Sequence, residues 1–169
     1  LDFISKERGI KVSTQFNSFF NAAASNNWAL ADTIYWDIAP RSYQYASELP
    51  QDPDIANELW EFVHNTYWTY RCLNNWDPTL MSIYANDFLQ SITGRSVLFT
   101  GTDSGRFAIS AFLNTNNLAI PIITAINSLG SSEYIEYLKD YSPGTIIIPQ
   151  RGYIKDTYNI ISLITQTLE

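Results

Sequence analysis

The chain of 169 residues contains a single cysteine, Cys72, and a single histidine, His64. One cysteine excludes an intrachain disulfide and any metal site built from several thiolates. One histidine excludes every metal site that needs two imidazoles. We expect Cys72 to be a small buried apolar residue and His64 to be a hydrogen-bonded, inert residue within a helix. The sequence therefore predicts no metal site and no cofactor.

Basic residues and long apolar runs are also scarce. Ten Lys and Arg stand against seventeen Asp and Glu, so the net charge is −7, and this balance argues against a nucleic-acid partner. No apolar run approaches the length of a membrane span, and the N-terminus shows no signal-peptide pattern. Because the chain starts at Leu1 and not at Met, we expect it to be an excised piece of a longer protein or a mature product, with any membrane anchor outside this sequence.

Apolar and aromatic residues are plentiful, at 46% and 15% of the chain. This composition is typical of a folded, acidic globular domain. Residues 28–91 carry nine acidic and two basic side chains and all five tryptophans. Packing between helices accounts for such an aromatic content, and a platform for stacking sugars is the alternative.

The first half of the chain has helical patterns separated by start and stop signals. We predict helix over 13–38, with a break at Asn26 and Asn27 and an end before Pro40. Asp52-Pro53 and Asp77-Pro78 each resemble a cap followed by a first helical residue, so we predict helices from these points to about 74 and 91. Residues 41–49 are ambiguous between a short helix and a loop.

From residue 93 onward the pattern alternates between strand and helix. We predict strands over 96–100, 120–126 and 145–149, with helices beginning near 106, 132 and 157. Such alternation is typical of a parallel sheet. The expected fold class is α/β: a small, mainly parallel sheet of about three strands in 93–169, with an all-helical region, 1–92, packed on or beside it as one structural unit.

The turn after the first predicted strand is the sharpest candidate for a binding site. Its small residues let a ligand approach the backbone, while the helix start and Arg106 attract an anion. Ligands of open α/β sheets bind at this edge, where the next strand also ends. The glycine spacing excludes a P-loop or dinucleotide fingerprint, and helix capping is the competing explanation. The candidate ligand-binding residues are Gly101, Thr102, Asp103, Ser104, Gly105, Arg106, Asn127 and Ser128.

Three stretches together resemble a known group of proteins. They are Phe99–Phe107 (FTGTDSGRF), Ile123–Leu129 (ITAINSL) and Tyr134–Leu138 (YIEYL). In order and spacing they resemble the extracytoplasmic part of bacterial multi-span membrane proteins that are glycosyltransferase-like and of uncharacterised function. The resemblance spans residues 97–138, about a quarter of the chain, and leaves residues 1–92 outside it. Ser104 stands where the most similar members of the group have Pro. The resemblance implies a role with surface glycans or lipid-linked sugars and supplies no catalytic residues.

We therefore expect a non-catalytic extracytoplasmic domain of a larger membrane protein, with a glycan or lipid-linked sugar as its partner. One alternative is a small-anion or sugar-nucleotide binding domain or enzyme that uses Asp103, Arg106 and Asn127. Another is a helical module that binds a protein partner through its Trp-rich middle third. The sequence leaves the oligomeric state open.

Overall fold

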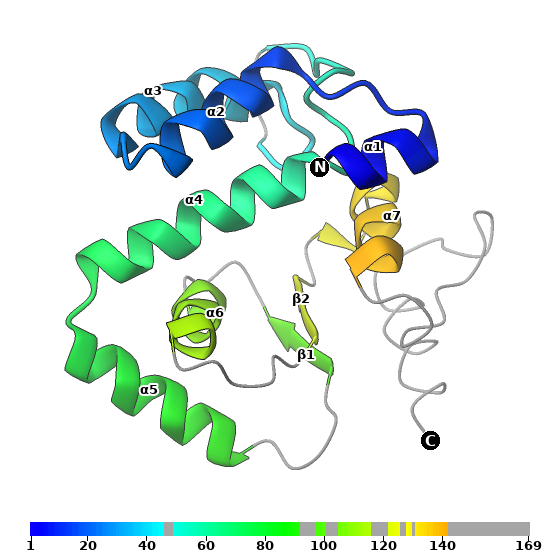
Figure 1. Ribbon diagram of the computed structural model, residues 1–169. Helices are drawn as coiled ribbons and strands as arrows, with labels where there is room; N and C mark the ends of the chain where they lie inside the picture. The colour runs from blue at the N-terminus through cyan, green and yellow to red at the C-terminus, as the bar shows by residue number, and fades with distance from the viewer. Residues whose placement is uncertain are drawn as a thin grey trace. The chain divides into compact units, whose positions relative to one another are not determined.

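The structure is a computed structural model, and it describes residues 1–45, 49–91, 97–100, 105–115, 122–125, 128–129 and 131–141. Helices dominate this part of the chain, with one short 3-10 turn and two short strands (Figure 1). The elements are α1 (Asp2–Arg8), α2 (Thr14–Ala24), α3 (Trp28–Ile38), η1 (Ala39–Arg41), α4 (Trp60–Asn75), α5 (Pro78–Ser91), β1 (Val97–Thr100), α6 (Gly105–Thr115), β2 (Ile122–Ala125) and α7 (Ser132–Tyr141).

The expected fold class is wrong, because the protein is mainly helical. The strands predicted over 96–100 and 120–126 are present as β1 and β2, but each has only four residues and they pair with each other alone within the described residues. Such a pair is too small to form a sheet layer, so the α/β description does not hold. The strand expected over 145–149 and the helix over 157–168 lie outside the described residues.

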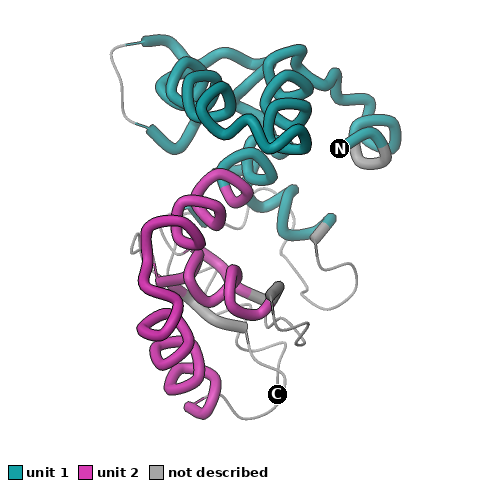
Figure 2. The backbone as a smooth tube through the Cα atoms, turned by 60° about the vertical axis from the view of Figure 1, so that its left-hand side comes forward, with its two compact units in different colours: residues 1–64, 128–169 teal, residues 65–127 magenta. Residues whose placement is uncertain are grey.

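The chain divides into two compact units (Figure 2). Unit 1 comprises residues 1–64 and 128–169, and unit 2 comprises residues 65–127. The sequence predicted a boundary at residue 92 because the composition changes there. The two units are instead defined by which residues contact one another, so they do not divide at residue 92. α4 begins in unit 1 and ends in unit 2.

In unit 1, α2 and α3 lie side by side (Figure 1). The Ser13 hydroxyl accepts a hydrogen bond from the Gln15 N–H at 3.3 Å, and the Asn27 side chain accepts one from the Leu30 N–H at 3.3 Å. Asn26 lies between the helices with a φ of 57°, a left-handed conformation that Asn tolerates. The predicted break at Asn26 and Asn27 is therefore confirmed, and it lets Phe16 of α2 become fully buried.

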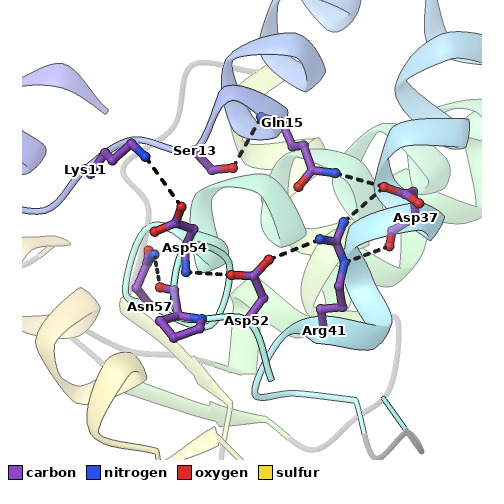
Figure 3. A network of polar contacts seen from close by, with 9 residues as sticks. Lys11, Ser13, Gln15, Asp37, Arg41, Asp52, Asp54 and Asn57 are labelled. Atoms are coloured by element: carbon purple, nitrogen blue, oxygen red, sulfur yellow. Dashed lines mark hydrogen bonds and ion pairs between the residues drawn. The ribbon is translucent and has the colours of Figure 1, made fainter. Parts of the chain in front are cut away.

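The predicted start of the next helix is wrong. Asp52 does act as a cap, since its carboxylate accepts from the Asp54 N–H at 3.0 Å, but turns follow and α4 begins only at Trp60. Arg41 secures this turn by contacting Asp52 at 3.1 Å and Asp37 at 3.0 Å (Figure 3). By contrast, Asp77 caps α5 as predicted and accepts from the backbone N–H groups of residues 79 and 80.

An ion-pair cluster joins α1, which the sequence patterns did not indicate, to α7. The Arg8 guanidinium donates to Asp140 through Nε at 3.0 Å and Nη2 at 2.6 Å, and it also contacts Glu136. Lys139 adds a second contact to Glu136 at 2.7 Å. Burial alone would raise the pKa of Glu136, but the hydrogen bonds from Lys139 and Arg8 outweigh it, so this pKa is lowered.

We predict that Glu136→Gln lowers the free energy of unfolding at pH 7 by about 1 kcal/mol, since it removes the charge that Arg8 and Lys139 contact. A carboxylate whose folded pKa is lowered stabilises the protein above its unfolded pKa and loses this effect as the pH falls through the folded pKa. The difference from wild type should therefore shrink as the pH falls below 4.5, the ordinary pKa of this carboxyl group. Urea denaturation at pH 7 and at several lower pH values measures it, with Glu7→Gln on the exposed face of α1 as the control.

In unit 2, α5 packs against α6. A buried apolar cluster forms between the end of α4, α5 and α6; its members are Cys72, Met81, Phe107, Ala108 and Ala111, with Trp68 and Trp76 partly buried against it. The prediction for Cys72 is confirmed: the thiol is buried, and burial raises its pKa.

Candidate functional site: the strand–helix–strand crossover

The candidate site lies where β1 and β2 end and α6 begins. The two strands run parallel, with Phe99 opposite Thr124 and Thr100 opposite Ala125. The Thr100 hydroxyl donates to the backbone carbonyl of Thr124 at 3.3 Å and ties the strand ends together. Because α6 connects β1 to β2, its N-terminus follows the carboxyl end of β1, the edge at which parallel strands bind ligands.

Arg106, the second residue of α6, is unusually buried for an arginine at 9% exposure. Its guanidinium carbon lies 4.3 Å from the centre of the Phe107 ring, a cation–π distance. Phe107 in turn stacks on Trp68 of α4, with ring centres 6.1 Å apart and planes 24° apart. The Phe107 ring, itself backed by Trp68, thus covers one face of the guanidinium, while its Nε has no hydrogen-bond partner in the described part of the chain.

A side-chain hydroxyl on β2 is a second buried polar group without a hydrogen-bond partner in the described chain. Thr124 is fully buried, and among the residues described its Oγ1 has no hydrogen-bond partner. Leaving a buried polar atom without a partner costs about 1–3 kcal/mol. Arg106 at the start of α6 and Thr124 near the end of β2 thus supply a cation and a hydroxyl donor, and the dipole of α6 adds positive potential at its N-terminus. Such a set suits an anion with several oxygens.

The structure describes only some of the residues predicted for this site. Gly105 begins α6 and Arg106 follows it. Ser128 belongs to unit 1, where its Oγ accepts from the Gln44 amide at 3.5 Å, so it falls in a different unit from Arg106. The other candidates, Gly101, Thr102, Asp103, Ser104 and Asn127, lie outside the described residues.

Sequence reasoning missed the contributions of Trp68, Thr100 and Thr124. A polar Thr near the end of a short apolar strand was the available signal for the two threonines. Nothing in the local pattern placed Trp68 beside the first turn of α6, since that contact joins residues 39 positions apart, Trp68 and Phe107.

A second concentration of polar atoms is buried in unit 1 around the start of α4. His64 is buried and its Nδ1 lies 2.9 Å from the Tyr35 hydroxyl, which is 2.7 Å from that of Tyr45. The expectation of a hydrogen-bonded helix histidine is confirmed. Trp60 is fully buried and stacks on Tyr35 with ring centres 5.5 Å apart. Helix packing therefore accounts for this part of the aromatic content.

Beside these rings, Glu61 is a fully buried carboxylate. The Tyr43 hydroxyl donates to its Oε1 at 2.7 Å, and the Gln44 amide donates to the same oxygen. Gln44 also accepts from the Trp60 indole at 2.8 Å. Burial first, and then the charge of Glu61, raise the pKa of Tyr43, so this hydroxyl remains a donor throughout the physiological range.

In the described part of the chain, every helix is too short or too polar to span a lipid bilayer. No group of three or more His, Cys, Asp and Glu side chains in that part of the chain is arranged to hold a metal ion.

Together, these features define a mainly helical protein with one parallel strand–helix–strand crossover, at which a buried arginine begins the helix. Comparisons with protein-family models, curated proteins and solved structures found no match for the chain.

Proposed function

We propose that the crossover of unit 2 binds the phosphate of a phosphorylated sugar. The observation that carries the proposal is the buried guanidinium of Arg106, whose Nε has no partner among the described residues. Burying a charge is costly unless it is paired. A bound anion would supply the missing acceptor, and the proposed role is one of binding, not of reaction.

The surrounding groups support an anionic ligand. α6 has eleven residues, long enough for its dipole to favour negative charge at its N-terminus. The Thr124 hydroxyl adds a donor that nothing in the described chain uses. Arginine is well suited to phosphate because its planar donors match two oxygens at once.

The sugar part of the proposal comes from the resemblance of residues 97–138 to glycosyltransferase-like membrane proteins. A lipid-linked sugar and a nucleotide sugar both present a sugar on a diphosphate. The phosphate chemistry expected at Arg106 is therefore the same for both sources, and the experiment has to separate them.

Thermal unfolding in the presence of three probes tests this proposal: inorganic pyrophosphate, a uridine diphosphate sugar and a short-chain polyprenyl diphosphate sugar. A ligand at about 100 times its Kd stabilises a protein by about 2.7 kcal/mol, a rise of several degrees in Tm. We expect all three to stabilise the protein through the shared phosphate. The stronger of the two sugar ligands identifies the source.

Arg106→Gln should abolish the stabilisation, whereas Arg71→Gln, a change at an exposed arginine of α4, should leave it intact. Arg106→Lys keeps the charge but loses the planar donors, so we expect an affinity at least about tenfold weaker. Circular dichroism checks that each variant folds. The proposal is wrong if none of the probes shifts the Tm of the wild type, or if Arg106→Lys binds them as wild type does.

We also propose that the domain lies outside the cytoplasm as part of a larger membrane protein, as the resemblance implies. Reporter fusions within the full-length protein test this location. A reporter placed after residue 169 that is active only outside the cytoplasm would support it, and one active only in the cytoplasm would refute it.

A further inference from the structure

The helix α5 exposes a stripe of large apolar side chains. Leu80, Ile83 and Tyr84 are 64%, 53% and 40% exposed. Their spacing of three and four residues places them on one face of the helix. A second face, which carries the buried Met81 and Ala85, already packs inside unit 2. α5 is therefore apolar on two faces, although one face suffices to hold it in unit 2.

Such a stripe is informative because single exposed apolar residues are ordinary, whereas a contiguous set marks an interaction surface. Trp76 extends it toward the start of the helix, since its ring centre lies 6.0 Å from that of Tyr84. The edge-on packing of these rings orders the aromatic end of the stripe before any partner arrives.

The charges beside the stripe indicate the chemistry of the partner. Asp77 precedes α5 and Asp87 lies within it; both are exposed, and residues 78–91 contain no Lys, Arg or His. An antiparallel pairing of α5 with a second copy, centred on residue 82, would place Asp77 opposite Asp87 of that copy. Like charges destabilise such a pair, and an anionic membrane surface would be repelled in the same way.

We propose that the α5 stripe, made of Leu80, Ile83 and Tyr84 between Asp77 and Asp87, docks an amphipathic helix of a protein partner. That helix would offer a leucine-rich face to the stripe and Lys or Arg at both ends of the contact. Ten residues of helix separate the two aspartates, about 15 Å. The basic residues of the partner should therefore lie about three helical turns apart.

A pair of synthetic helical peptides tests the proposal directly. Both carry the same leucine face; one has Lys flanking it and the other has Glu. Fluorescence anisotropy of labelled peptides should show that the protein binds the Lys peptide about tenfold more tightly at low salt, a difference expected of two ion pairs. In 0.5 M salt the preference should fall to about twofold or less, because screening weakens exposed pairs.

Three variants assign the binding to this surface. Ile83→Glu should weaken binding of the Lys peptide about tenfold or more, since it places a charge in the middle of the stripe. Asp77→Asn combined with Asp87→Lys should remove the preference for Lys, and Asn preserves the cap that residue 77 provides. Glu7→Lys, a matched change of charge on α1, should leave the preference unchanged.

Four results would overturn the proposal. The first is equal affinity for the two peptides, and the second is a preference that the double variant does not alter. The third is self-association of the wild type in sedimentation equilibrium that Ile83→Glu abolishes, which would assign the stripe to a second copy. The fourth is binding to anionic lipid vesicles that Ile83→Glu abolishes, which would assign it to a membrane.

Discussion

Replacing Trp60 by Ala should lower the free energy of unfolding by about 3–5 kcal/mol, the usual cost of removing a fully buried aromatic side chain. The ring stacks on Tyr35 and lies 5.8 Å from the ring of His64. Its loss also leaves the Gln44 amide oxygen without the indole donor, which lies 2.8 Å away. Urea denaturation followed by far-UV circular dichroism measures the change without relying on tryptophan fluorescence.

Trp36→Ala is the matched control, because this residue precedes α4 in the same unit and is 47% exposed. It should cost about 1 kcal/mol, as most substitutions with partial burial do. Equal costs for the two variants would show that the rings around Trp60 do not form the core of unit 1.

Glu61→Leu should lower the free energy of unfolding by about 2–4 kcal/mol. The change removes the buried acceptor of two partly buried donors, the Tyr43 hydroxyl and the Gln44 amide. A buried donor left without an acceptor costs about 1–3 kcal/mol, and the apolar leucine recovers only part of the loss. Urea denaturation at pH 7 measures the effect, and Glu58→Leu, a change at a less buried position nearby, serves as the control.

The same variant should change the titration of Tyr43. Its pKa is raised by burial and then by Glu61, so its protonated form stabilises the fold fully below pH 10, and this contribution is lost as the pH rises through the folded pKa. Without the charge of Glu61, the Tyr43 hydroxyl should ionise at a lower pH. Ultraviolet absorbance during alkaline titration isolates the Tyr43 titration in two backgrounds. The wild type minus Tyr43→Phe gives its curve with Glu61 present, and Glu61→Leu minus Glu61→Leu combined with Tyr43→Phe gives its curve without Glu61. Identical difference curves would contradict the role given to Glu61.

Local signals predicted several elements well. The helix start near residue 13, the cap at Asp77, the break at Asn26 and Asn27, and the stop before Pro40 all match the structure. The helix predicted to begin near 132 does so as well, and the Ser131 hydroxyl caps it by accepting from the Tyr134 N–H at 3.2 Å. Each of these signals works through a hydrogen bond or a steric clash within about four residues, which a linear sequence displays directly.

The same kind of reasoning failed at Asp52, because a capping side chain can precede either a helix or a turn. Asp52 accepts a backbone hydrogen bond, as a cap does, yet turns and not a helix follow it. Arg41 contacts Asp52 from eleven residues away and stabilises the turn. The fold class failed for a related reason. Alternation of strand and helix correctly located β1, α6 and β2, but it did not reveal how small the strand pair is beside the helices.

The sequence by itself determined the acidic charge, the exclusion of disulfides and of thiolate metal clusters, and the ends of most helices, because these depend on composition or on neighbouring residues. Only the tertiary structure decided that Arg106 and Glu61 are buried and that Leu80 and Ile83 are exposed. Burial depends on contacts between residues far apart in the chain, such as Trp68 with Phe107. These contacts form only when whole helices pack, so no short stretch of sequence reports them.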